Sequence, residues 1–94
     1  MDKATAIEIF GSTYHVRGEQ DAEYLRELAA VVDRKMREVS GQMKAPDPAR
    51  VAIQAALNLA DELHQCQNRQ ERERVEIQEK VAELAGELTD ALQR

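Results

Sequence analysis

The stretch that decides the fold runs from Pro48 to Arg94 and reads PARVAIQAALNLADELHQCQNRQERERVEIQEKVAELAGELTDALQR. After Pro48 it has no further proline and only one glycine, Gly86, so little in it would interrupt a helix. We expect one continuous helix of roughly 70 Å, several times the ordinary length of a globular helix. The other half of a 94-residue chain is too small to cover it. The sequence therefore predicts pairing with another copy of the chain.

The start of this helix and its first turns predict a dimer. Asp47 is a preferred N-cap residue, and proline is favoured at the first helical position. From Val51 to Leu63 the helix is apolar on nearly every side, which indicates burial between its own domain and a second subunit. Asn58 in this stretch would fix the register of the two helices, or else serve a capping or surface role. The expected dimer interface is Ala56, Asn58, Leu59, Ala60 and Leu63.

The rest of the helix divides into a polar segment and a second apolar stripe. Residues 64–76 are almost wholly polar and cannot hold a tight core. Ile77, Val81, Leu84 and Leu88 then follow at spacings of 4, 3 and 4, which is an a/d seam of about two heptads. Because so short a seam makes a weak isolated pair, a higher assembly is expected, held together by this coiled-coil or tetramer seam. We therefore expect a globular head, residues 1–63, and an extended coiled-coil arm, residues 64–94.

The first half of the chain predicts a small β-hairpin and a mid-length helix. Residues 4–17 alternate apolar and polar side chains around a turn at Phe10-Gly11-Ser12-Thr13. A helix from about Ala22 to Gln42 carries one apolar stripe, formed by Leu25, Leu28, Val32, Met36, Val39 and Met43. The predicted fold class is α+β, mostly α, with a ββαα protomer whose long C-terminal helix forms a coiled coil.

Composition argues against several classes of function. Charged residues are 33% and aromatic residues 3% of the chain, and the net charge of −5 argues against nucleic acid as the main ligand. The start resembles no signal peptide and no apolar run could cross a bilayer, so we expect a cytoplasmic protein that does not bind membranes. His15, His64 and Cys66 lack metal-ligand spacing. We expect no catalytic residues, no cofactor and no enzymatic activity.

The charge is unevenly distributed along the chain. Residues 1–50 hold eight Lys and Arg against nine Asp and Glu, whereas residues 51–94 hold five against nine. A basic patch for an acidic partner would therefore lie in the first half. His15, on the outer face of the second strand beside Arg17, is either a plain surface histidine or a partner contact.

Three segments together resemble the ZapA family of bacterial cell-division proteins. They are Ile9-Phe10-Gly11-Ser12-Thr13-Tyr14-His15-Val16, then Glu23-Tyr24-Leu25-Arg26-Glu27-Leu28-Ala29 with Val32-Asp33-Arg34-Lys35-Met36, then Ala55-Ala56-Leu57-Asn58-Leu59-Ala60-Asp61-Glu62-Leu63. Each is weak alone, but their order and spacing are fairly specific. They run through the first two thirds of the chain, and the remainder resembles the family only as a coiled coil.

The resemblance implies an assembly and a partner. It implies dimers of the long helices that join through their coiled-coil ends into a tetramer, which binds FtsZ and cross-links its protofilaments in the mid-cell division ring. Some family members carry a basic residue after the hairpin glycine, where this chain has Ser12. We therefore expect contacts at Arg17, His15, Lys35, Arg37, Lys44 and Arg50. A holdase-like chaperone and a pure oligomerisation module are the alternatives.

Overall fold

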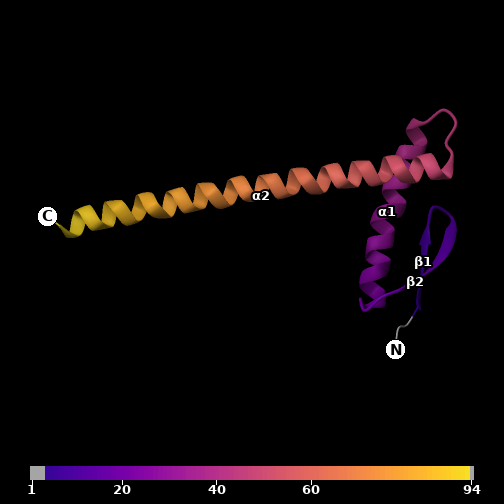
Figure 1. Ribbon diagram of the computed structural model, residues 1–94, viewed down its shortest axis with the longest axis horizontal. Coiled ribbons are helices and arrows are strands. Elements are labelled where there is room, and N and C mark those ends of the chain that lie inside the picture. Colours follow the sequence, from indigo (N-terminus) through magenta and orange to yellow (C-terminus); the bar gives the residue numbers. More distant parts are fainter. Residues whose placement is uncertain (1–3, 94) are drawn as a thin grey trace. The chain divides into compact units, whose positions relative to one another are not determined.

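The computed structural model describes residues 4–93, which form two strands followed by two helices (Figure 1). The elements are β1 (Ala4–Ile9), β2 (Ser12–Arg17), α1 (Ala22–Gln42) and α2 (Pro48–Leu92). The predicted α+β class and ββαα order are thus confirmed. Contacts divide the chain into two units, one ending at Leu59 and the other beginning at Ala60. The division into a head and an arm after residue 63 stays a prediction.

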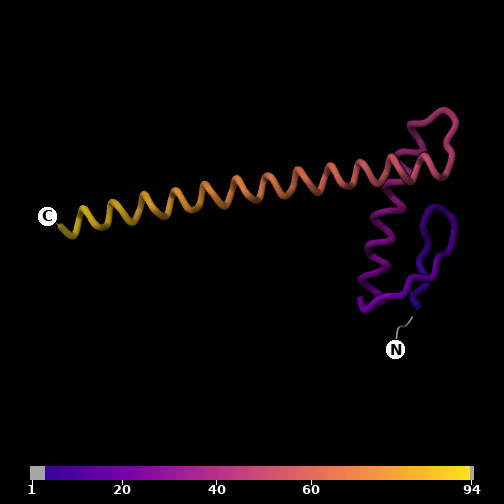
Figure 2. Tube along the Cα trace, in the orientation of Figure 1, coloured from indigo at the N-terminus to yellow at the C-terminus, as the bar shows by residue number. Residues whose placement is uncertain are grey.

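The two strands form an antiparallel hairpin (Figure 2), and the pairing of the strands leaves a two-residue turn between them. Ile9 pairs with Ser12, and the turn residues Phe10 and Gly11 have φ of 53° and 80°. Positive φ at both positions matches the twist of a tight hairpin, and glycine adopts it without strain. The predicted four-residue turn was too long, because Ser12 and Thr13 belong to β2.

Helix α1 has the predicted bounds but buries a slightly different face. Leu25, Ala29, Met36 and Val39 are buried, and Val32 packs against this core. Leu28, which the sequence placed in the stripe, is 42% exposed. The reason is that the hairpin packs on the side of α1 that carries Ala29, and Leu28 lies a quarter turn away.

The start of α2 closes the small core of the first unit. The backbone carbonyl of Asp47 accepts the first helical hydrogen bond from Val51 N–H at 2.9 Å. Its carboxylate accepts one from Arg50 N–H at 3.4 Å, so Asp47 acts as the predicted N-cap. Val51 and Ala55 are buried with Met36 and Val39. Ile9, Phe10, Val32 and Met43 pack around this cluster.

From Ala60 onward the second unit is a single helix with almost all side chains exposed. Ion pairs within the helix support it: Arg74 with Glu71 at 2.6 Å and Lys80 with Glu83 at 3.8 Å. The helix ends at Leu92, and the predicted end at Arg94 lies outside the described residues. Within residues 4–93, no helix is long and apolar enough to span a bilayer.

Candidate partner-binding surfaces

The hairpin presents two chemically different faces. Directly paired residues share a face of a sheet, and the face alternates along each strand. One face is mostly polar and is made by Ala4, Ala6, Glu8, Thr13, His15 and Arg17. The other is mostly apolar and is made by Thr5, Ile7, Ile9, Ser12, Tyr14 and Val16. Each face borders its own concave surface of the first unit.

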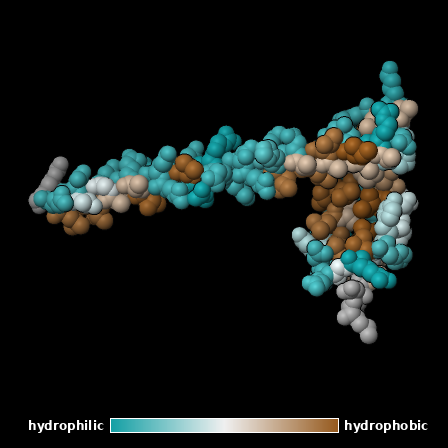
Figure 3. All heavy atoms as spheres, in the orientation of Figure 1, coloured by the Kyte–Doolittle hydropathy of each residue, from teal (hydrophilic) through white to brown (hydrophobic). Residues whose placement is uncertain are grey.

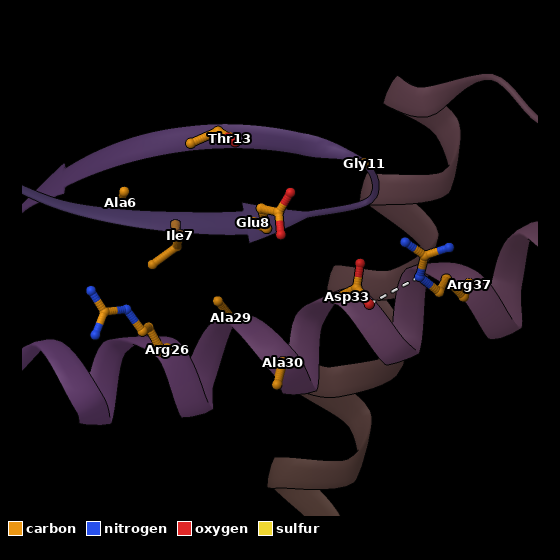
Figure 4. A pocket seen from close by; sticks show the side chains of 10 residues that line it. All are labelled: Ala6, Ile7, Glu8, Gly11, Thr13, Arg26, Ala29, Ala30, Asp33 and Arg37. Carbon is orange, nitrogen blue, oxygen red and sulfur yellow. Dashed lines mark hydrogen bonds and ion pairs between the residues drawn. The ribbon is translucent and has the colours of Figure 1, made fainter.

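The polar face borders a hollow of 610 Å³, here called the polar hollow (Figure 4). Its walls come from the hairpin and from one side of α1, where small alanines lie between two arginines. The lining residues are Ala6, Ile7, Glu8, Gly11, Thr13, Arg26, Ala29, Ala30, Asp33 and Arg37. Figure 4 shows Arg26 beside the strands at one end and Arg37 near the turn at the other. Two guanidinium groups therefore border one shallow surface.

Asp33 ties the hairpin turn to α1 at the edge of this hollow. Its Oδ1 accepts a hydrogen bond from Phe10 N–H at 2.7 Å, and its Oδ2 accepts one from Arg37 Nε at 2.9 Å. The hydrogen bond from Arg37, together with that from Phe10, lowers the pKa of Asp33. The same pairing raises the pKa of Arg37. Asp33 thus stays ionised and holds both the turn and the guanidinium in place.

The structure brings together only some of the six predicted partner contacts. His15 and Arg17 are exposed on the polar face of the hairpin, and Arg37 lines the polar hollow that borders this face. Lys35 lies about 160° around α1 from Arg37, and its ammonium pairs with Glu38 at 3.3 Å. Lys44 and Arg50 are exposed, one in the loop before α2 and the other in its first turn. The six residues therefore do not form one patch.

Arg26 is a surface cation that the sequence analysis did not select. It is exposed, and no ion pair of Arg26 is seen among residues 4–93. Arg26, Ala30, Asp33 and Arg37 follow spacings of 4, 3 and 4 on one side of α1. That spacing was visible in the sequence. The sequence could not show that this side of α1 borders a hollow, because it does not reveal which side of α1 the hairpin leaves open.

The apolar face of the hairpin borders a groove of 640 Å³, here called the apolar groove. Its walls are the hairpin, the middle of α1 and the first turns of α2. The lining residues are Ile7, Ile9, Phe10, Ser12, Tyr14, Val16, Val32, Met36, Pro48, Ala49 and Ala52. Figure 3 shows hydrophobic atoms gathered over the hairpin and α1. Tyr14 is 53% exposed although it lies on this face.

The residues predicted for the dimer interface lie largely open in one protomer. Ala56, Ala60 and Leu63 are exposed, whereas Asn58 and Leu59 are half-buried. Asn58 Oδ1 accepts a hydrogen bond from Gln54 Nε2 at 2.9 Å, so its amide has a partner on its own helix. The interface, and the role of Asn58 in its register, stay predictions.

The second apolar stripe is also open to solvent in one protomer. Ile77, Val81, Leu84 and Leu88 are exposed on the surface of α2. Their role in a coiled coil or tetramer stays a prediction. Among residues 4–93, no group of three or more His, Cys, Asp or Glu side chains is placed to hold a metal ion.

Comparison with known sequences identifies a family of similar proteins. A family model described as "Cell division protein ZapA" matches residues 5–88. Cell division protein ZapA of Halalkalibacterium halodurans is 39% identical over 59 residues, which cover 63% of this chain and 65% of that protein. The protein of the same name from Bacillus thuringiensis strain Al Hakam is 38% identical over 53 residues, covering 56% and 60%. The match spans less than two thirds of either relative's length.

Two solved structures have a similar fold. "ZapA mutant dimer from Geobacillus stearothermophilus" gives a TM-score of 0.64 at 26% identity and covers 83% of this chain and 91% of that chain. "Unknown conserved bacterial protein from Pseudomonas aeruginosa PAO1" gives 0.75 at 28% identity and covers 92% and 96%. The hairpin followed by two helices is therefore an arrangement that this chain shares with known proteins.

Proposed function

The chain belongs to the ZapA family of cell division proteins, and from this membership we propose that it binds FtsZ and cross-links FtsZ filaments. The site of action would be the division ring at mid-cell, in the cytoplasm. The family is one of cell-division proteins rather than a known enzyme family. The protein would act as a mechanical link and use no cofactor.

The observation that carries the proposal is the clustering of arginine side chains beside the hairpin. His15 and Arg17 stand on its polar face, and Arg26 and Arg37 line the adjoining polar hollow. Arg37 is engaged by Asp33, but Arg17 and Arg26 are exposed and show no ion pair with another described residue. We propose that acidic side chains of FtsZ meet these two guanidiniums. Such contacts steer association and fix orientation more than they add affinity.

Cross-linking needs more than one binding surface in each assembly. We propose that two copies pair through the apolar first turns of α2, and that pairs join through Ile77, Val81, Leu84 and Leu88. Each of these side chains is more than half exposed in one protomer, which supports their use in an interface. Individually weak contacts with FtsZ would then gain from multivalency once one filament is engaged.

Co-sedimentation with FtsZ polymers tests the partner and its binding surface. Arg17→Glu and Arg26→Glu should each reduce the amount of protein in the pellet, and the reduction should shrink as salt is raised. Arg72→Glu is the matched control, since it makes the same charge change at an exposed site on α2. Oligomer mass should stay unchanged in all three, because exposed charges contribute little to folding.

Two results would contradict parts of this proposal. Wild-type protein that stays in the supernatant with polymerised FtsZ would exclude FtsZ as a direct partner. If the wild type pellets and both hairpin-side variants pellet equally well, FtsZ must bind elsewhere, and Lys44 and Arg50 are the next cations to change.

The alternative of a holdase-like chaperone has one observation in its favour. The apolar groove and the stripe from Ile77 to Leu88 are both exposed in one protomer, and a holdase needs exposed apolar surface. Light scattering and an aggregation assay separate the two functions. A tetramer that does not suppress aggregation of a denatured client would exclude the chaperone.

A further inference from the structure

Strand β2 leaves one edge of the hairpin open. The sheet has only two strands, and β1, not β2, packs against α1. Figure 4 shows Thr13 on β2 farther from α1 than Glu8 on β1. Five of the six residues of β2 are exposed, and Val16 is half-buried. Among residues 4–93, no strand or loop pairs with the outer edge of β2, so this edge is accessible to another chain.

The register of the hairpin identifies the backbone groups on this edge. Hydrogen-bonded and non-hydrogen-bonded pairs alternate along an antiparallel ladder, and the pair that closes a two-residue turn is a hydrogen-bonded one. Ile9 and Ser12 form that closing pair. The backbone N–H and C=O groups that point away from β1 therefore belong to every second residue of β2, namely Thr13, His15 and Arg17.

Strand β2 lacks two features that commonly protect an edge strand from pairing. Such edges often carry a proline or a β-bulge. The strand reads STYHVR and has no proline, and its one-to-one pairing with β1 leaves no bulge. A sheet of two strands is also only marginally stable. A third strand would therefore add hydrogen bonds where the hairpin has none and would stabilise it.

The side chains beside this edge indicate what kind of segment fits. An added strand continues the alternation of faces, so its residues opposite Thr13, His15 and Arg17 lie on the polar face. Arg17 is exposed and shows no ion pair with another described residue, and an acidic side chain opposite it would form a cross-strand pair. Residues opposite Tyr14 and Val16 lie on the apolar face, where Tyr14 is 53% exposed. The fitting segment is therefore extended, with acidic and apolar side chains on opposite faces.

We propose that an extended segment of FtsZ adds to β2 as a third strand, with an acidic side chain opposite Arg17 and apolar side chains beside Tyr14 and Val16. The inference rests on the proposed binding of FtsZ and adds the way in which the hairpin holds it. Backbone hydrogen bonds supply affinity in this mode of recognition, and the alternate side chains supply specificity.

Amide hydrogen exchange of the full wild-type chain tests the proposal. The chain is labelled alone and with an excess of polymerised FtsZ, and exchange is then quenched and read by NMR for each residue. Strand addition should slow exchange about tenfold or more at every second N–H of β2, beginning with Thr13, because these groups become hydrogen-bonded. The N–H groups between them already face β1 and should change much less. Binding through side chains alone would not produce this alternation.

Two substitutions of His15 separate its backbone from its side chain. His15→Pro removes an N–H that points away from β1, so the hairpin loses no hydrogen bond, and the extended conformation of the preceding residue suits a proline. His15→Ala removes only the side chain. In co-sedimentation, His15→Pro should weaken binding to FtsZ about fivefold more than His15→Ala does, as expected for one lost hydrogen bond. Circular dichroism and sedimentation velocity check that both variants fold and assemble.

The outcomes separate this inference from the function on which it rests. If the wild type pellets with FtsZ but the alternating N–H groups keep their exchange rates, strand addition is wrong and the binding of FtsZ stands. Protection of the same groups in the chain alone would show that another copy occupies the edge, which also overturns the proposal. A wild type that does not pellet overturns the proposed function itself. Equal losses in the two His15 variants would contradict strand addition, and if His15→Pro does not fold, the exchange experiment decides.

Discussion

At the residue scale, Asp33 connects two parts of the first unit. It bonds to the backbone N–H of Phe10, which lies 23 positions earlier in the sequence, and to the side chain of Arg37. The sequence analysis did not single it out. An aspartate in a helix is ordinarily solvated, and only docking of the hairpin against α1 gives this one two partners.

Asp33→Asn should lower the free energy of unfolding at neutral pH. The pKa of Asp33 is lowered in the folded protein, so its stabilising effect is complete above the ordinary aspartate pKa of about 3.9. The effect is lost as pH falls through the lower folded pKa, where the wild-type carboxyl becomes protonated. The difference between wild type and variant should therefore be large at pH 7 and shrink below about pH 4.

Chemical denaturation at a fixed protein concentration measures this difference. Asp90→Asn is the control, because it makes the same change at an exposed carboxylate near the end of α2. If Asp33→Asn lowers the free energy of unfolding as much at low pH as at pH 7, the ionised carboxylate does not hold the turn.

Replacing Gly11 and Gly86 with alanine should change the stability of the protein in opposite directions. Its φ is 80°, yet an added Cβ would meet no atom within 4 Å, so the only cost of Gly11→Ala is backbone strain of about 1 kcal/mol. Gly11→Asn should cost less, since asparagine tolerates this conformation. Gly86→Ala, in the open surface of α2, should stabilise the helix by up to about 1 kcal/mol. Thermal unfolding at one protein concentration would show the order.

At the element scale, local signals predicted most of the fold. The bounds of α1 and the start of α2 at Pro48 follow from apolar periodicity and from the Asp47-Pro48 pair. The error at Leu28 has a different origin. Leu28 and Ala29 both fit an apolar stripe, and the choice between them depends on where the hairpin packs. The apolar periodicity and the capping residues of a helix can be read from neighbouring positions in the sequence. The side of α1 on which the hairpin packs depends on residues far away in the sequence.

Ala60→Glu tests whether the first turns of α2 form an interface. In one protomer Ala60 is exposed and glutamate is a good helix former, so the substitution is harmless to an isolated chain. In an interface it would bury an unpaired charge, at about 2 kcal/mol or more. The dimer dissociation constant should then rise by roughly thirtyfold or more. Analytical ultracentrifugation would detect this, with Ala82→Glu as the exposed control.

At the scale of the whole molecule, a substitution should be able to remove the proposed cross-linking of FtsZ filaments while leaving the binding of a single filament. Residues 64–76 put a long polar segment between the two apolar stretches of α2. Ile77→Glu should therefore dissolve the outer assembly and leave the inner dimer folded. The variant should still pellet with FtsZ polymers, with reduced avidity, but it should bundle filaments poorly.

Light scattering and low-speed sedimentation of FtsZ bundles measure the two effects. Val75→Glu is the control, since it introduces the same charge close by but away from the stripe. If Ile77→Glu stays tetrameric or bundles as well as the wild type, the stripe does not join the dimers.

The uninterrupted course of α2 has a consequence for how such a protein can change its reach. Seven residues inserted into the polar segment between Leu63 and Ile77 would lengthen the helix by about 10 Å and turn the far stripe by only about 20°. Two added residues would turn it by about 160° instead. Gains or losses of seven residues would thus change the distance between the two apolar stretches and keep them nearly in phase, as eleven residues also would, whereas two residues would turn the far stripe away. The length of α2 can therefore change without turning the far stripe away, but only by particular numbers of residues.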